Sequence, residues 1–157
     1  MPTATRRARL AHVPLPDFGM AATEPLLPAS IYHERLQRLR ARMERRGYDH
    51  VVVWGDREHS ANIAYLTGFD PRFEEAVLVV APVGDPAILL GNECYGLADV
   101  APLPMRAVRF QDLSLSGQPR DRSRPLPEIL GDQGIVRSGR VGVVGWKVYA
   151  SRETIEV

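Results

Sequence analysis

A cluster of ionisable side chains follows a short apolar run in the first half of the chain. The run is Val-Val-Val-Trp-Gly at positions 51–55, and the cluster is Asp56, Arg57, Glu58 and His59. Two carboxylates can share general acid and base work when their pKa values are set apart, and a histidine can act as a base near neutral pH. The alternative is structural, with Asp56 capping a following helix and Glu58 supporting its first turn. Both interpretations stay open at this stage.

The remaining motifs exclude several complete catalytic sites. The four histidines form no HExxH pair, and a single cysteine cannot supply a zinc-binding cysteine pair. The chain contains no GKS or GKT phosphate loop and no G-x-S-x-G elbow. Three glycines at 139, 142 and 145 surround a predicted strand, and this spacing is not a dinucleotide fingerprint. The sequence alone therefore assembles no catalytic site.

Cys94 is the only cysteine, so no internal disulfide can form. This usage fits a reducing cytoplasm. We expect Cys94 to be a small buried apolar residue, because free cysteine is among the most buried residue types. The alternative, a nucleophile, would need a histidine beside it in the fold.

Composition indicates an ordinary globular protein. The 157 residues carry a formal net charge of +1, which gives no general attraction to nucleic acid or membrane. No apolar run reaches the length of a membrane-spanning helix, and no hydrophobic region follows Arg6-Arg7 as a signal peptide would require. RNA binding through the arginine-rich N-terminus and first helix is a further alternative.

The elements around the ionisable cluster would place it in a crevice. The β-branched run at 51–55 is typical of a buried strand. Ile63 and Leu66 then fall on one side of a short helix that Gly68 ends. A strand that turns at once into a helix leaves a crevice at the carboxyl end of the strand, where open α/β sheets bind ligands.

The first 29 residues are predicted to form an arm outside the domain, because five prolines oppose helix formation there. Four apolar residues suggest that part of this arm lies on the domain or on a neighbouring molecule: Leu15, Phe18, Leu26 and Leu27. A helix is expected over 31–46, with Ser30 as its N-cap and Gly47 as its stop. Its apolar stripe consists of Tyr32, Leu36, Leu39 and Met43.

The later elements complete an α/β pattern. We expect an antiparallel hairpin from strands at 76–81 and 87–90, a short helix at 92–100, a strand at 105–110, a helix at 125–133 and a strand at 140–146. Helices alternate with strands around one hairpin. The expected fold of residues 30–157 is therefore one α/β domain, with a mixed sheet of about five strands flanked by helices.

The order of these elements carries a family resemblance. The helix at 31–46 leads to Gly47-Tyr48-Asp49 and a valine strand. The stretch Asn62-Ile63-Ala64-Tyr65-Leu66-Thr67-Gly68-Phe69 comes next, followed by Glu75-Ala76-Val77-Leu78-Val79-Val80 and Ile88-Leu89-Leu90. Over about residues 30–146 the chain resembles the N-terminal domain of the creatinase, prolidase and Xaa-Pro aminopeptidase family, the pita-bread metallohydrolases. The Asn-x-x-Tyr-Leu-Thr-Gly-Phe element is the most specific part of the match.

The resemblance implies a ribonuclease H-like motif without ribonuclease chemistry. In this family a following C-terminal domain is catalytic, and there two Asp, one His and two Glu hold two divalent metals, commonly Mn, Co or Zn. The sequence ends at Val157, before such a domain could begin, so none of these ligands is carried over. We expect this chain to be the non-catalytic N-terminal part of a longer cytoplasmic hydrolase, partnered by its own catalytic domain and by other subunits of a homo-oligomer such as a dimer. The alternative is a stand-alone α/β module that binds a ligand or a protein.

The resemblance also implies that loops of this domain wall an active site, often that of a neighbouring subunit. Six residues are candidates for this wall: Asp56, Arg57, His59, Arg72, Phe73 and Glu74. An arginine there could clamp a substrate carboxylate, and the alternative is an ordinary surface loop. Asn62, Tyr65 and Gly68 match the family pattern and are expected to be structural, with Gly68 at positive φ. Position 64 is alanine, where some members carry an aromatic residue.

Overall fold

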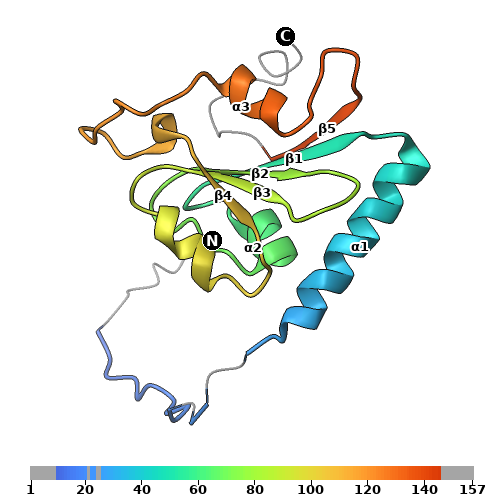
Figure 1. The fold of residues 1–157 in the computed structure, drawn as a ribbon. Coiled ribbons are helices and arrows are strands. Elements are labelled where there is room, and N and C mark those ends of the chain that lie inside the picture. The colour runs from blue at the N-terminus through green and yellow to red at the C-terminus, as the bar shows by residue number, and fades with distance from the viewer. Residues whose placement is uncertain (1–9, 21, 24–25, 146–157) are drawn as a thin grey trace, which may run out of the picture.

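A five-stranded mixed sheet forms the centre of the domain, in the order β4-β3-β2-β1-β5 (Figure 1). The computed structural model describes residues 10–20, 22–23 and 26–145. The strands are β1 (His50–Gly55), β2 (Ala76–Val80), β3 (Ala87–Leu90), β4 (Arg106–Arg109) and β5 (Val141–Val144). Strand β2 is antiparallel to β1 and β3, whereas β5 is parallel to β1 and β4 is parallel to β3. The expected α/β fold with a mixed sheet and an antiparallel hairpin is therefore confirmed.

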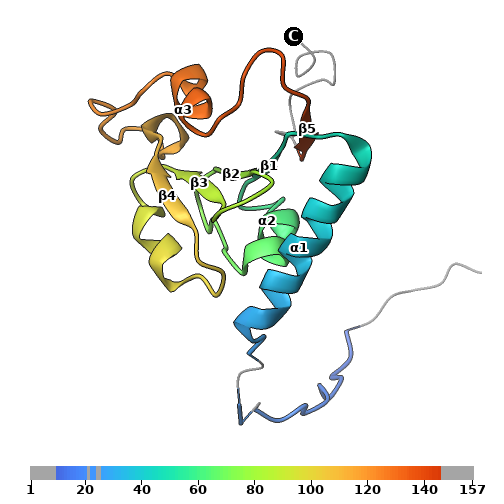
Figure 2. The same cartoon turned by 45° about the vertical axis from the view of Figure 1, so that its right-hand side comes forward.

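Helices cover both faces of this sheet (Figure 2). Helices α1 (Ala29–Arg46) and α2 (Ala61–Thr67) pack on one face, over a core that includes Val51, Val53 and Leu78. Helix α3 (Leu126–Asp132) packs on the other face through the fully buried Ile129. Two short 3₁₀ helices, η1 (Tyr95–Val100) and η2 (Gln111–Leu113), lie in the connections. In the described part of the chain, no helix is both long enough and apolar enough to cross a bilayer.

Helix α1 follows its predicted apolar stripe and begins slightly earlier than expected. Tyr32, Leu36 and Met43 are buried, and Leu39 packs against the same core. Gly47 ends the helix at φ 66°, as predicted. The predicted N-cap is wrong, because Ser30 lies inside the helix and Pro28 is the cap. Pro28 holds an extended backbone, and its carbonyl accepts the Ile31 amide, so no side-chain cap is used.

The helices and strands predicted after residue 90 form, but their ends are shifted. The helix expected at 92–100 is the 3₁₀ helix η1, which begins only at Tyr95. Helix α3 lies within the predicted 125–133, and the strands β4 and β5 are shorter than predicted. The predicted last strand ran to residue 146, which lies outside the described residues.

Gly68 ends helix α2, and two features of this position require a residue without a side chain. Its φ is +75°, as expected from the sequence, and only glycine adopts this conformation without strain. A Cβ at this position would also lie 2.7 Å from Pro102 Cδ. The close approach lets the residues after α2 pack against the 100–103 segment.

The described residues before α1 form no helix or strand and extend away from the domain (Figures 1 and 2). Leu15, Phe18 and Leu26 are 88%, 91% and 82% exposed, and Leu27 is half exposed. The described part of the arm therefore does not cover its own domain, which contradicts one of the two expectations for these four residues.

Candidate functional site

Strand pairing brings three connections together at one edge of the sheet. Gly55 at the end of β1 is opposite Ala76 at the start of β2, and Ala76 is opposite Leu90 at the end of β3. The segments 56–60, 70–75 and 91–94 therefore emerge side by side. We call this the loop edge. It is the edge at which the sequence predicted a crevice.

Asp56 and His59 form a fixed pair at the loop edge. Asp56 Oδ1 accepts the backbone amides of Glu58 and His59 at 2.8 and 2.7 Å, and it lies 3.0 Å from His59 Nδ1. The Asp56 side chain is 18% exposed and that of His59 is 52% exposed. The carboxylate therefore orients the imidazole and leaves Nε2 available at the surface, an arrangement suited to proton transfer or to hydrogen bonding with a ligand.

These hydrogen bonds set the protonation of Asp56. Partial burial raises the pKa of Asp56, but the amides of Glu58 and His59 and the His59 ring together leave it below its ordinary value. Asp56 is thus an anion at neutral pH. It closes its own turn rather than capping α2, whose first cap residue, Ser60, makes no side-chain hydrogen bond. The prediction that Asp56 caps α2 is therefore wrong, because its carboxylate bonds to amides of the turn that precedes the helix.

The other polar candidates of this turn lie in solvent. Arg57 donates to Glu58 Oε1 at 3.3 Å, and both side chains are about two-thirds exposed. Exposed pairs of this kind contribute little to stability. Arg57 therefore remains free to exchange its partner for an incoming anion.

Arg72 and Phe73 project from the neighbouring segment. The Arg72 amide donates to Asp70 Oδ1 at 2.9 Å, and its φ of 59° is the single positive value among the described non-glycine residues. Phe73 is 51% exposed. A hollow of about 180 Å³ adjoins Arg72, and its lining also includes Phe69, Leu97 and Val100. Binding sites for small molecules are commonly 300–1,000 Å³, so this hollow suits an apolar side chain better than a whole ligand.

Glu74 differs from the other five candidates because it is only 2% exposed. Its Oε1 accepts the Glu93 amide at 3.1 Å, and its Oε2 accepts the Cys94 amide at 2.7 Å. Gly91 also lies against this carboxylate, because a Cβ at position 91 would be only 2.5 Å from Glu74 Oε1. Glu74 therefore ties segment 70–75 to segment 91–94 from the inside, and nothing in the sequence pattern distinguished it from its exposed neighbours.

Cys94 is buried, as expected, and is 0% exposed. Burial raises the pKa of its thiol, and the thiol donates to the Pro71 carbonyl at 2.8 Å. A reactive cysteine needs the opposite, a lowered pKa and access to solvent. The nucleophile interpretation of Cys94 is therefore excluded.

The motif residues Asn62, Tyr65 and Gly68 lie on or at the end of α2. Tyr65 is half exposed, and the Arg35 guanidinium stacks on its ring at 4.2 Å while donating to its carbonyl at 2.8 Å. Arg35 thus ties α1 to α2 through this tyrosine. Asn62 is exposed. Thr67 belongs to the same motif, and its buried hydroxyl donates to the Ile63 carbonyl and accepts the Phe69 amide, a role that no sequence pattern indicated.

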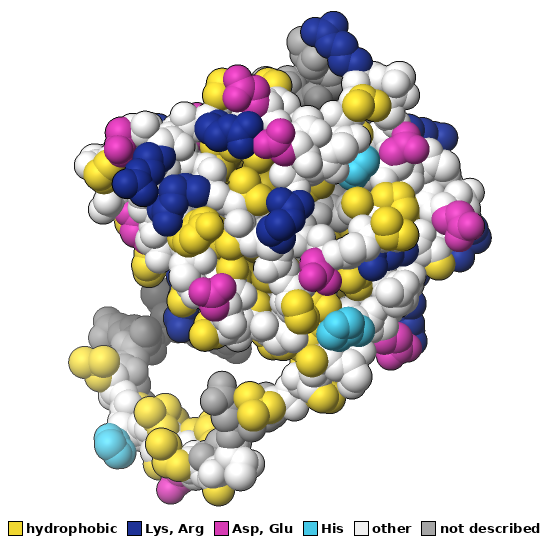
Figure 3. All heavy atoms as spheres, viewed as in Figure 1, with side chains coloured by type: hydrophobic (Ala, Val, Ile, Leu, Met, Phe, Trp, Pro, Cys, Tyr) yellow, Lys and Arg dark blue, Asp and Glu magenta, His cyan; other side chains and the backbone are white. Residues whose placement is uncertain are grey.

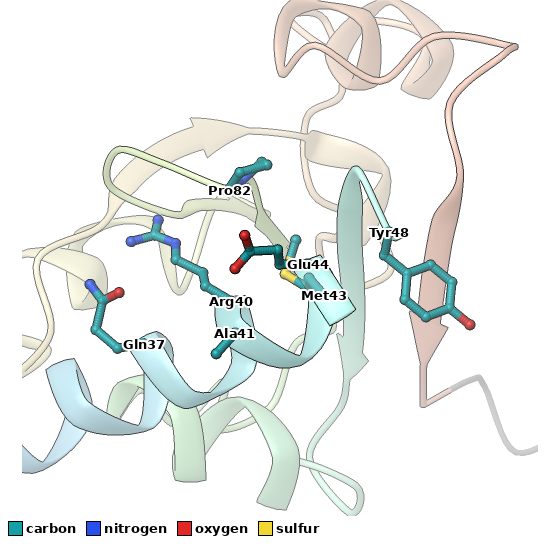
Figure 4. A pocket seen from close by; sticks show the side chains of 7 residues that line it. All are labelled: Gln37, Arg40, Ala41, Met43, Glu44, Tyr48 and Pro82. Carbon is teal, nitrogen blue, oxygen red and sulfur yellow. The ribbon is translucent and has the colours of Figure 1, made fainter. Parts of the chain in front are cut away.

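A second hollow, of about 460 Å³, lies beside α1 and was not expected from the sequence (Figure 4). Its lining consists of Gln37, Arg40, Ala41, Met43, Glu44, Tyr48 and Pro82. Arg40 donates to the carbonyls of Ala81, at 3.0 Å, and Gly84. These bonds fasten the β2–β3 turn to α1, so Arg40 is already engaged in holding the fold.

No group of three or more His, Cys, Asp or Glu side chains among the described residues could hold a metal ion. The Asp56–His59 pair supplies only two such ligands. The residues of the loop edge therefore do not fit a two-metal centre.

Comparison with known proteins agrees with this fold. The model of the creatinase/prolidase N-terminal domain matches residues 35–152. The chain therefore belongs to the creatinase/prolidase N-terminal domain family. No curated protein matches the sequence.

A solved domain structure shares this fold. The creatinase/prolidase-like N-terminal domain from Corynebacterium diphtheriae is 20% identical, with a TM-score of 0.52, over 80% of this chain and 83% of that chain. Dipeptidase PepE from Mycobacterium ulcerans is 20% identical over 53% of this chain, with a TM-score of 0.42. Prolidase from Pyrococcus furiosus is 14% identical over 74% of this chain, with a TM-score of 0.46. The matches span only 23% of the dipeptidase and 27% of the prolidase.

Proposed function

We propose that this chain is the non-catalytic N-terminal domain of a metal-dependent, cytoplasmic Xaa-Pro aminopeptidase or prolidase-like hydrolase. The family match over residues 35–152 is the observation that carries this proposal. The two divalent metals, Mn, Co or Zn, would be held by a following catalytic domain. The domain's partners would be that catalytic domain and other subunits of a homo-oligomer.

The loop edge would form part of the wall of the active site. Exposed cationic and aromatic groups, Arg57, Arg72 and Phe73, emerge there beside the oriented His59. An arginine can hold a peptide carboxylate through two parallel hydrogen bonds, and an aromatic ring can pack against a proline ring. Asp56 would act by orienting His59, and the buried Glu74 by holding the segment that carries Arg72 and Phe73.

The isolated 157-residue polypeptide tests the non-catalytic part of the proposal. It should cleave no Xaa-Pro dipeptide or longer Xaa-Pro peptide when supplied with Mn²⁺, Co²⁺ or Zn²⁺. It should also retain no stoichiometric metal after gel filtration. Metal-dependent turnover that copurifies with this polypeptide would refute the proposal.

The length of the native polypeptide tests whether this domain is part of a longer enzyme. An antibody raised against this domain should detect a band of more than twice the chain mass in an extract of the source cells. In that enzyme, His59→Ala and Arg72→Ala should raise KM for proline peptides with a smaller effect on kcat, because both residues would contact substrate rather than the metals. Arg38→Ala is a matched control, since Arg38 is an exposed arginine on α1 that pairs with the exposed Glu34.

The second candidate is a stand-alone binding module. The hollow beside α1 favours it, because its volume of about 460 Å³ lies within the 300–1,000 Å³ common for small-molecule sites and Glu44 lines it (Figure 4). A native band at the mass of this chain would support this candidate. Ligands should then be sought both at this hollow and at the Asp56–His59 pair.

A further inference from the structure

No strand among residues 10–20, 22–23 and 26–145 pairs with the outer edge of β5. The Arg140 carbonyl accepts the Asp49 amide at 2.8 Å, and the Arg140 amide donates to Asp49 Oδ2. The backbone groups of a residue point to the same side of a strand and alternate between neighbours. Gly142 and Val144 therefore face β1, whereas the backbone groups of Val141 and Val143 face outward. Among the described residues, β5 pairs with β1 alone.

The opposite edge of the sheet, at β4, is protected. The amides of Arg106 and Phe110 bond to the β3 side, so Ala107 faces outward. The Tyr95 hydroxyl reaches the Ala107 carbonyl at 3.5 Å, and the Arg109 guanidinium stacks on the Tyr95 ring at 4.1 Å. A covering side chain and flanking arginines are devices that prevent strand addition. Strand β5, with the sequence Val-Gly-Val-Val, has no charged residue.

A groove with an apolar floor runs beside the open edge. It has a volume of about 300 Å³ and lies between α1 and β5, lined by Leu39, Arg42, Met43, Arg46, Tyr48, Val51, Gly142, Val143 and Val144. Val143 and Val144 are 49% and 38% exposed. An uncharged edge strand next to apolar side chains is a template for an added strand.

The N-terminal arm presents apolar side chains that the domain does not cover. Leu10, Val13, Leu15, Phe18 and Met20 are between 69% and 104% exposed. Figure 3 shows hydrophobic side chains gathered along this arm, away from the body of the domain. Contiguous exposed apolar groups of this kind mark an interaction site.

Pro14 and Pro16 are spaced so that residues 13–17, as an extended strand, keep all backbone N–H donors along one side. Pro14 and Pro16 are two residues apart, so their missing amides fall on the same side. Val13, Leu15 and Asp17 keep their amides on the other side. Such a strand can pair along one side only, and it blocks further addition at its outer side. The Gly19 amide donates to Asp17 Oδ1 at 2.8 Å, and this turn ends the segment.

We propose that residues 13–17 of one chain add as an edge strand to β5 of a second copy of this chain, with their apolar side chains extending over the groove beside α1. Exchange of two arms around a two-fold axis gives a closed dimer. The inference goes beyond the proposed function, because the arm lies outside the family match at residues 35–152. It requires no catalytic domain.

A second copy suits the geometry better than the arm's own β5. The arm joins α1 at Ala29, whereas β5 lies beside the Arg46 end of this helix. The 18 residues of α1 separate these two ends by about 27 Å. An arm that folded back would have to run along the whole helix, and in this structure its apolar side chains stand clear of the domain.

The 157-residue chain itself tests the proposal. Light scattering coupled to gel filtration at micromolar concentration should give twice the chain mass of 17.5 kDa. Leu15→Pro removes an inward amide and should weaken the dimer at least about tenfold in Kd, since the two-fold dimer loses this hydrogen bond twice. Pro14→Leu is the matched control, because it alters the outward side and should leave the Kd unchanged. Residues 14 and 15 are exposed, so both variants should fold.

Hydrogen exchange locates the contact. The amides of Val141, Val143 and Leu15 should exchange slowly in the dimer and faster in Leu15→Pro. A monomer would overturn the proposal, as would a dimer that Leu15→Pro leaves intact. A monomer with a protected Val143 amide would show that the edge is covered within one chain, which also overturns it.

Discussion

The carboxylate of Glu74 accepts the backbone amide of Cys94 at 2.7 Å, and this hydrogen bond joins two connections that are 20 residues apart in the chain. The second oxygen of the same carboxylate accepts the Glu93 amide. A carboxylate that is this deeply buried is stable because both oxygens have donors. The segment that carries Arg72 and Phe73 is thereby fixed relative to the end of β3.

Removal of this carboxylate should strongly destabilise the domain. Glu74→Ala leaves the buried Cys94 amide and the partly buried Glu93 amide without an acceptor, and we expect a loss of about 3 kcal/mol in the free energy of unfolding. Glu74→Gln keeps one acceptor oxygen and should cost less. Urea denaturation measures both, and Glu34→Ala, at an exposed ion pair, should change stability by less than about 0.5 kcal/mol. Equal stability of Glu74→Ala and the unmodified protein would contradict this role.

Asp56 should make stability depend on pH in the acid range. Its folded pKa lies below the ordinary value of 3.8, because the amides of Glu58 and His59 outweigh the effect of partial burial. The stabilisation is therefore fully present above the unfolded pKa and is lost as the pH falls through the lower, folded pKa. Asp56→Ala should cost about 1–2 kcal/mol at pH 7.

The pH dependence separates this effect from a simple loss of packing. Urea unfolding at pH 7 and at pH 3 should show a smaller difference between the two pH values in Asp56→Ala than in the unmodified protein. If the variant and the unmodified protein lost equal stability between these pH values, Asp56 would not be the group responsible.

Two glycines at positive φ offer a matched test of close packing. Gly68 has φ +75°, and a Cβ there would lie 2.7 Å from Pro102. Gly84 has φ +80°, and a Cβ there would meet no described residue within 4 Å beyond its own chain neighbours. Alanine at either site introduces backbone strain of about 1 kcal/mol. Gly68→Ala should cost at least about 1 kcal/mol more than Gly84→Ala, because it also displaces Pro102. Thermal unfolding of the two variants gives the comparison, and equal losses would argue against the contact.

Arg40 should hold the β2–β3 turn against α1. Arg40→Met keeps much of the aliphatic contact and removes the donors to the Ala81 and Gly84 carbonyls. We expect a loss of about 1–2 kcal/mol and faster amide exchange in residues 81–86. Exchange in α3, on the other face of the sheet, serves as the internal control and should change only in proportion to global stability.

Local patterns in the sequence determined most elements of this protein. Spacings of three and four residues placed Tyr32, Leu36 and Met43 on one buried stripe, and β-branched runs identified the strands. Gly47 and Gly68 end helices as predicted, because the requirement for a left-handed residue is local. The family resemblance likewise depended on the order of such local elements.

Tertiary structure alone decided how these elements meet. Strand β5 pairs with β1, and the first pair, His50 and Val141, is 91 residues apart in the chain. No local pattern encodes such a non-local pairing. The sequence did not separate Glu74 from the other five wall candidates, yet Glu74 is buried because its carboxylate accepts the amides of Glu93 and Cys94. Asp56 contacts His59 within its own turn, whereas the described apolar residues of the arm remain exposed. Burial and hydrogen-bond partners depend on what the rest of the chain brings close, which is why a sequence pattern by itself leaves them open.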